Sequence, residues 1–205
     1  MQQKSNHVTN SNGNDNNVKE TCTLWHEVFE WFDCIVITMI CILFVFTFIF
    51  RQVQIDGSSM EDTLTDGERV IVSDLFYTPK YGDIVIISSE VYDNKPIIKR
   101  VIATENQWVD IRDGSVFVGD TVDTLVKVGN EFANSDFTEE TIGEGLYGTQ
   151  KYPLQVPKNC IFVLGDNRHV SLDSRTTAVG VVDKRQILGK AIYRVYPLQK
   201  FGDLY

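Results

Sequence analysis

Two polar residues lie in apolar stretches of this chain and could do chemistry together. Ser59 follows Gly57 and Ser58, and Lys99 lies within a run of β-branched residues at 96–102. Burying an unpaired ammonium group costs free energy, and losing the proton relieves that cost. A neutral lysine amine is a general base that can activate a serine hydroxyl as a nucleophile. The two residues therefore predict a hydrolase with a Ser-Lys pair.

A third segment, residues 165–175, supplies polar groups that could surround this pair. It follows an apolar strand and combines one glycine with hydroxyl, amide, carboxylate and guanidinium side chains. Ser171 could orient the lysine amine, and Asp173 and Arg175 could form an ion pair that holds the loop in shape. The competing interpretations are a solvated loop here, a charge-protected edge strand around Lys99, and a flexible turn around Ser59.

His169 offers a different mechanism, in which a serine, a histidine and an aspartate act as a triad. The three histidines of the chain are scattered without zinc-ligand spacing, so we expect no metal and no cofactor. Cys160 precedes an apolar strand and is expected to be a small core residue rather than a nucleophile. The net charge of −9 argues against binding to nucleic acid, which requires a basic face.

The N-terminal part of the chain indicates a membrane anchor. Residues 1–23 are rich in Asn, Gln and Ser, and we expect a disordered tail. Residues 24–51 combine an aromatic interfacial segment with an uncharged run at 34–50, which predicts one transmembrane helix. A cleaved signal peptide would end in small residues, and a buried core helix would be unusually apolar on all faces. Basic residues are balanced on the two sides of the run, so charge does not set its orientation.

The remaining residues, 52–205, are expected to form a mostly β catalytic domain built on an antiparallel β-sheet. Short apolar runs bounded by turn residues predict its strands. These runs lie at 69–72, 84–87, 97–103, 108–111, 116–118, 160–164 and 187–196. Residues 120–157 are rich in Gly, Thr, Asn and acidic residues with weak periodicity, which indicates an inserted smaller lobe.

Four segments, in this order behind the apolar run, resemble the sequence boxes of one enzyme family. They are Ser59-Met60-Glu61-Asp62-Thr63-Leu64, Gly82-Asp83-Ile84-Val85, Ile98-Lys99-Arg100-Val101-Ile102, and Gly165-Asp166-Asn167-Arg168 with Ser171, Asp173, Ser174 and Arg175. The chain resembles the bacterial type I signal peptidases, membrane-anchored Ser-Lys endopeptidases of the peptidase S26 type, from Cys34 to Tyr196. It departs from the family where Asp62 replaces a proline of the first box, and at His169 and Val170 in the last.

The resemblance implies a role for each matching residue. Ser59 would be the nucleophile and Lys99 the general base of an acyl-enzyme mechanism. Ser171 would bond to the lysine amine. Asp173 and Arg175 would support the site as a structural ion pair.

The resemblance defines the oxyanion hole less fully. The backbone N–H of Ser59 would be one donor. Gly57 stands where some members of the family carry a second donor on a side chain, and glycine has none. That donor must come from elsewhere, and Ser58 is the nearest candidate.

The implied substrates are exported preproteins whose signal peptides are cut after a small-x-small segment. The implied location is the cell membrane, with a single span in the lipid bilayer and the catalytic domain on the extracytoplasmic side. An extended peptide could add beside an edge of the β domain, with alternate side chains in shallow apolar pockets. The candidate walls of those pockets, which could equally be core residues, are Ile55, Met60, Leu64, Ile84, Ile86 and Ile98.

Two functions of other kinds stay open at this point. The protein could be an inactive membrane-anchored β scaffold that only binds exported chains. It could also be a self-cleaving Ser-Lys repressor, although the anchor and the missing DNA-binding segment argue against that. The sequence does not indicate an oligomeric state.

Overall fold

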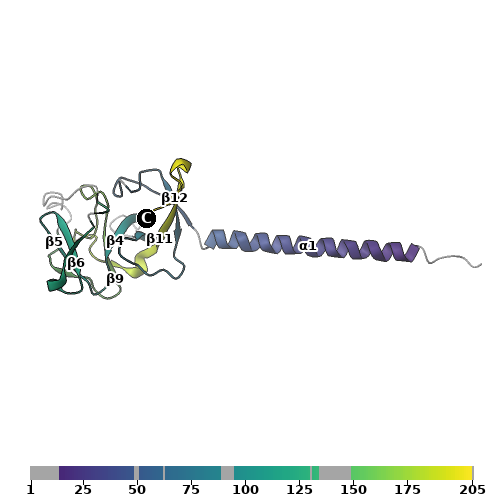
Figure 1. Ribbon diagram of the computed structural model, residues 1–205, viewed down its shortest axis with the longest axis horizontal. Helices are drawn as coiled ribbons and strands as arrows, with labels where there is room; N and C mark the ends of the chain where they lie inside the picture. Colours follow the sequence, from purple (N-terminus) through teal and green to yellow (C-terminus); the bar gives the residue numbers. More distant parts are fainter. Residues whose placement is uncertain are drawn as a thin grey trace, which may run out of the picture. The chain divides into compact units, whose positions relative to one another are not determined.

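The computed structural model describes residues 14–48, 51–61, 63–88, 95–129, 131–133 and 149–204 of the chain. The chain divides into two compact units, residues 1–48 and residues 49–205, which Figure 1 traces in chain order. Residues 1–13 of the expected tail and residues 130 and 134–148 of the expected lobe lie outside the described residues.

The described residues of the first unit form one helix, α1 (Asn14–Phe48). Its segment Glu27–Val45 has a mean hydropathy of 2.3 and is 0% buried within the protein, which fits a single membrane span. Residues 14–23 of the expected tail are part of this helix. Extending an existing helix needs only one further hydrogen bond per residue, so the apolar helix continues into the polar segment.

The second unit is mostly β, as expected, and its strand pairs are antiparallel. Among the described residues, the larger sheet has the order β1-β2-β11-β3-β4-β9-β10, and β12 pairs with β11. Its strands are β1 (Arg51–Gln54), β2 (Arg69–Ser73), β3 (Ile84–Ser88), β4 (Pro96–Ala103), β9 (Cys160–Leu164), β10 (Val182–Asp183), β11 (Ile187–Tyr196) and β12 (Gly202–Asp203). The described residues also form three short 3-10 helices, η2 (Val122–Thr124), η4 (Lys184–Gln186) and η5 (Leu198–Lys200).

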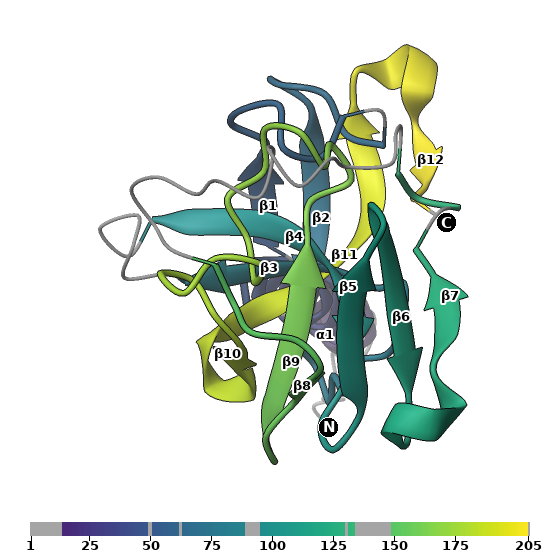
Figure 2. The ribbon, with the colours of Figure 1, turned by 90° about the vertical axis from the view of Figure 1, so that its left-hand side faces the viewer.

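The smaller sheet has the order β7-β6-β5-β8, and Figure 2 shows β5, β6 and β7 side by side. Its strands are β5 (Trp108–Arg112), β6 (Ser115–Gly119), β7 (Val126–Val128) and β8 (Leu154–Gln155). This sheet begins before residue 120, where the lobe is expected to start, because β5 and β6 belong to the same sheet as β7 and β8. The pairing of Trp108 with Gln155 joins segments far apart in the chain, which local composition does not reveal.

Strand β3 is buried on both faces. Ile84 and Ile86 belong to one hydrophobic cluster, and Val85 and Ile87 belong to another. Successive strand residues point to opposite faces, so a strand covered on both sides reads as an unbroken apolar run. Strand β4 lies beside β3 in the sheet and carries Lys99.

Candidate active site

The loop that carries Ser59 is closed at its base and packed along its length. The amide of Ile55 donates to the carbonyl of Glu68 at 2.8 Å. Within the loop, Met60 and Leu64 are almost fully buried in a hydrophobic cluster with residues of β2 and β3. These contacts fix the backbone on either side of Ser59.

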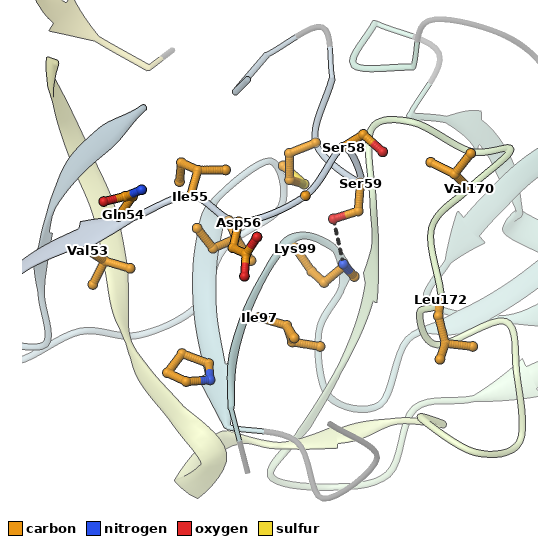
Figure 3. A pocket seen from close by; sticks show the side chains of 14 residues that line it. Val53, Gln54, Ile55, Asp56, Ser58, Ser59, Ile97, Lys99, Val170 and Leu172 are labelled. Atoms are coloured by element: carbon orange, nitrogen blue, oxygen red, sulfur yellow. Dashed lines mark hydrogen bonds between the residues drawn. The ribbon is translucent and has the colours of Figure 1, made fainter. Parts of the chain in front are cut away.

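Ser59 and Lys99 meet although 40 residues separate them, and the Nζ of Lys99 lies 2.9 Å from the Oγ of Ser59 (Figure 3). Lys99 is 2% exposed and pairs with Val85 of the buried strand β3. Burial lowers the pKa of Lys99 from its ordinary 10.5 to about 8; the charge of Asp173 opposes this shift, and that of Arg175 reinforces it. An amine with this pKa can serve as a base near neutral pH.

Asp173 and Arg175 form a buried ion pair. The Nε and Nη2 of Arg175 lie 2.8 and 2.9 Å from the two carboxylate oxygens of Asp173. The amide of Gly165 donates to the same carboxylate at 3.0 Å. Burial alone would raise the pKa of Asp173, but the guanidinium and these hydrogen bonds outweigh burial and hold the pKa below its ordinary value. The ionised carboxylate thus ties the two ends of the 165–175 loop together.

Ser171 does not make the expected hydrogen bond to the amine of Lys99. Its Oγ is buried and has no hydrogen-bond partner within the described part of the chain. The hydroxyl lies instead against Gly165, where an added Cβ would be 2.2 Å from the Oγ. The sequence places Ser171 in the right loop, but it does not determine the direction of the hydroxyl.

Arg100, the neighbour of Lys99, pairs with Asp166, a contact that sequence reasoning missed. The Nε and Nη2 of Arg100 lie 2.8 and 2.7 Å from the two carboxylate oxygens of Asp166, and both residues are buried. The hydroxyl of Thr63 donates to the same carboxylate at 2.6 Å. This pair therefore joins β4 and the 165–175 loop to the loop that carries Ser59. Thr63, Arg100 and Asp166 all lie in the sequence boxes, which was the one available sign that they act together.

A cavity of about 230 Å³ lies beside the Ser59–Lys99 pair. Its lining comes from residues 53–60 and 96–99, with Val170 and Leu172 on the opposite side in Figure 3. Polar and apolar atoms contribute about equally to the lining. The cavity is smaller than typical ligand pockets, so it suits small side chains.

The expected walls of the cavity fall into two groups. Those that line it are Ile55, Met60 and Ile98. Those that do not line it, and pack in the hydrophobic core instead, are Leu64, Ile84 and Ile86. The lining residues that sequence reasoning missed are Val53, Gln54, Asp56, Pro96, Ile97, Val170 and Leu172. Their proximity in sequence to Ser59, Lys99 and Ser171 was the available signal.

Gly57 and Ser58 both border the cavity. Gly57 has a φ of +94°, and an added Cβ would meet nothing within 4 Å, so backbone conformation rather than space requires glycine here. The amide of Gly57 donates to Asp66 at 2.9 Å and is therefore occupied. The amide of Ser59, by contrast, has no acceptor among the described residues.

His169 is exposed, and in the residues that the structure describes it makes no hydrogen bond to Ser59. The hydroxyl of Ser59 is bonded to Lys99 instead. The Ser-His-Asp alternative is therefore not favoured.

Comparison with known proteins shows the family of the chain. Residues 28–196 match the family model described as "Signal peptidase, peptidase S26". The chain belongs to this family. Signal peptidase I of Bacillus licheniformis is 31% identical over 85% of this chain and 92% of its own length. Signal peptidase I T of Bacillus subtilis is 33% identical over 83% of this chain and 86% of its own length. Signal peptidase IB of Staphylococcus aureus is 30% identical over 85% of this chain and 93% of its own length.

Within this signal peptidase fold, Gly165 is expected to tolerate no side chain. Its φ lies outside the left-handed region, but an added Cβ would be 2.2 Å from the Oγ of Ser171 and 2.5 Å from the carbonyl oxygen of Ser59. In Gly165→Ala the loop of Ser59 must shift, and a misplacement of about 1 Å can cost about 100-fold in rate. We expect kcat to fall by about that factor while KM changes little, as measured with a preprotein substrate.

A matched control for this substitution is Gly180→Ala, since there the nearest atom would be 3.4 Å from the new Cβ. Gly180 has a φ of +58°, so this variant carries backbone strain without a steric clash at Ser59. If both variants lost the same factor in kcat, a steric clash at Gly165 would not be the cause of the loss.

Proposed function

We propose that this protein is a type I signal peptidase that removes signal peptides from exported preproteins with Ser59 as nucleophile and Lys99 as general base. The observation that carries the proposal is the 2.9 Å approach of the two side chains with Lys99 buried and its pKa lowered to about 8. The family of the chain and the names of its relatives support the same reaction.

The reaction begins when the Oγ of Ser59 attacks the scissile carbonyl carbon and the neutral Nζ of Lys99 takes the hydroxyl proton. The C–N bond then breaks, and Lys99 gives this proton to the leaving amine. In the second half, water attacks the acyl-enzyme, and Lys99 accepts a proton from the water. That proton returns to the Oγ of Ser59 as the ester bond breaks, which restores the enzyme.

The tetrahedral intermediate needs hydrogen-bond donors for its oxyanion. The backbone N–H of Ser59 is suited to this role because no acceptor in the described part of the chain occupies it. The amide of Gly57 is bonded to Asp66 and is therefore unsuited. Ser58, which borders the cavity, remains our candidate for a second donor.

Strand addition is the mode of substrate binding that the sheet supports. Residues 96–99 of β4 pair with β3 on one side, while the pairing of β4 with β9 begins only at Arg100. Strand β1 is the other free edge near the cavity, since it is the first strand of the larger sheet. An extended peptide can hydrogen-bond to such edges and insert alternate side chains into the cavity. The small cavity accounts for a requirement for small residues.

We further propose that α1 anchors the protein in the cell membrane and that residues 52–205 act on the extracytoplasmic side. The hydropathy and exposure of Glu27–Val45 support a span. The side of the membrane rests on the family, because exported chains are processed after they cross. An anchor raises the effective concentration of a substrate whose signal peptide lies in the same bilayer.

Cleavage of a preprotein by the purified full chain in detergent micelles tests the proposal. Wild-type protein is expected to release the mature N-terminus after a small-x-small segment, and Ser59→Ala is expected to release none above background. The matched control is Ser115→Ala, which changes a buried serine of the smaller sheet outside the cavity. Cleavage by Ser59→Ala at the wild-type rate would rule out Ser59 as the nucleophile, whereas binding of preprotein without cleavage by the wild type would favour the scaffold.

A further inference from the structure

One charged side chain in the cavity has no part in the chemistry proposed above. Asp56 and Lys99 are the two ionisable residues among those described in the lining. Asp56 is exposed, and among the described residues it has neither a hydrogen bond nor an ion pair. Figure 3 shows Asp56 next to Ile55 on the side of the cavity away from Val170 and Leu172. When Lys99 is neutral, Asp56 is the remaining charge of this lining.

Asp56 does not set the pKa of Lys99. The charges that act on the pKa of Lys99 are those of Asp173, Arg175 and Asp166. Asp56 is not among the charges that shift this pKa. An exposed carboxylate that lines the cavity and has no partner among the described residues is free to interact with a substrate. A cationic side chain is the group that it would attract.

Alternation along the chain indicates which substrate residue meets Asp56. Val53 and Ile55 are partly or fully buried, whereas Gln54 and Asp56 are exposed. Residues of an extended peptide alternate in the same way, so those facing Ile55 must be small and apolar. The substrate residue between these two small residues then points the other way, toward Gln54 and Asp56.

We infer that Asp56 is a specificity-determining residue that favours lysine or arginine at the middle position of the small-x-small segment. This inference rests on the proposed function, since it assigns a preference within the same substrate cavity. Because the side chain is exposed, the preference is modest and is screened by salt.

The test compares model preprotein peptides that differ only at the middle position, with lysine, glutamine or glutamate there. For the wild type, kcat/KM is expected to follow the order lysine, glutamine, glutamate, with about two- to fivefold between the first two at low salt. In Asp56→Asn the lysine and glutamine peptides become equivalent, and in Asp56→Lys the order reverses. The control variant Asp120→Asn, an exposed aspartate outside the cavity, keeps the wild-type order.

The decisive quantity is the kcat/KM of the lysine peptide divided by that of the glutamine peptide. If this ratio is the same in the wild type and in Asp56→Asn, the inference is overturned. Failure of the proposed function has a different signature, because then the glutamine peptide is not cut even by the wild type. In that case the same three peptides are compared by equilibrium binding to Ser59→Ala and to Ser59→Ala/Asp56→Asn. Equal affinities of the lysine and glutamine peptides for Ser59→Ala would overturn the inference independently of catalysis.

Discussion

Replacing Lys99 with methionine is expected to abolish most activity and at the same time to stabilise the fold. Removal of a general base costs about 10²- to 10⁴-fold in kcat, because the hydroxyl of Ser59 then has no group to accept its proton. The fold gains because methionine fills the same buried site without a charge. A pKa lowered from 10.5 to about 8 corresponds to about 3 kcal/mol of free energy that favours the neutral amine in the folded protein.

The pH dependence of both effects follows from the same pKa. The rate of the wild type is expected to rise with pH and to level off above an apparent pKa of about 8, since the neutral amine is the active form in the proposed mechanism. At pH 7 about a tenth of the molecules carry the neutral amine, against about one in three thousand for a lysine at 10.5. Between pH 8 and 10.5 the unfolded chain binds the proton and the folded chain does not, so this residue makes stability rise with pH.

Two measurements check this prediction on the full chain in detergent. Preprotein cleavage across pH gives the rate profile. Urea unfolding gives the free energy of unfolding, and the fluorescence of Trp108, the one tryptophan in residues 49–205, reports the transition. The stability advantage of Lys99→Met is expected to be largest below pH 8 and to vanish toward pH 10.5. Lys95→Met, at an exposed residue just before β4, is expected to change neither quantity. A destabilised Lys99→Met would mean that the amine is a structural group held charged by its neighbours.

The sequence predicts those parts of the site that depend on residue type and order. Lys99 in a β-branched run, Ser59 in its turn and the polar loop at 165–175 are all visible as local patterns. Apolar runs bounded by turn residues likewise predict the strands, because strand burial imposes a local pattern.

Sequence reasoning fails where the answer depends on which strand lies next to which. Ile86 and Ile98 look alike in sequence, yet Ile98 lines the cavity and Ile86 is a core residue on the neighbouring strand. The hydroxyl direction of Ser171 depends on its contact with Gly165, which no local pattern encodes. The ion pair of Arg100 and Asp166 joins residues 66 apart, so it becomes evident only in the folded chain.

That ion pair carries the second large expected effect. Asp166→Ala is expected to lower the free energy of unfolding by about 3–5 kcal/mol, because it leaves the buried guanidinium of Arg100 without its counter-charge. Arg100 is 2% exposed and Asp166 is 0% exposed, so water cannot replace the lost partner without opening the loop. The hydroxyl of Thr63 loses its acceptor in the same variant, and the loop of Ser59 loses one of its ties.

The double variant Arg100→Met/Asp166→Leu separates the loss of a contact from the cost of an unpaired charge. With both charges removed, the penalty of a buried lone ion disappears, and most of the stability is expected to return, as measured by urea unfolding. Activity is expected to stay low, because Thr63 still lacks the carboxylate that holds it. The exposed pair of Arg185 and Asp183 provides the control, and Arg185→Ala is expected to shift the unfolding midpoint little. If the double variant were no more stable than Asp166→Ala, the unpaired charge would not be the main cost. The Arg100–Asp166 pair would then stabilise the fold mainly by packing between β4 and the loop of Ser59.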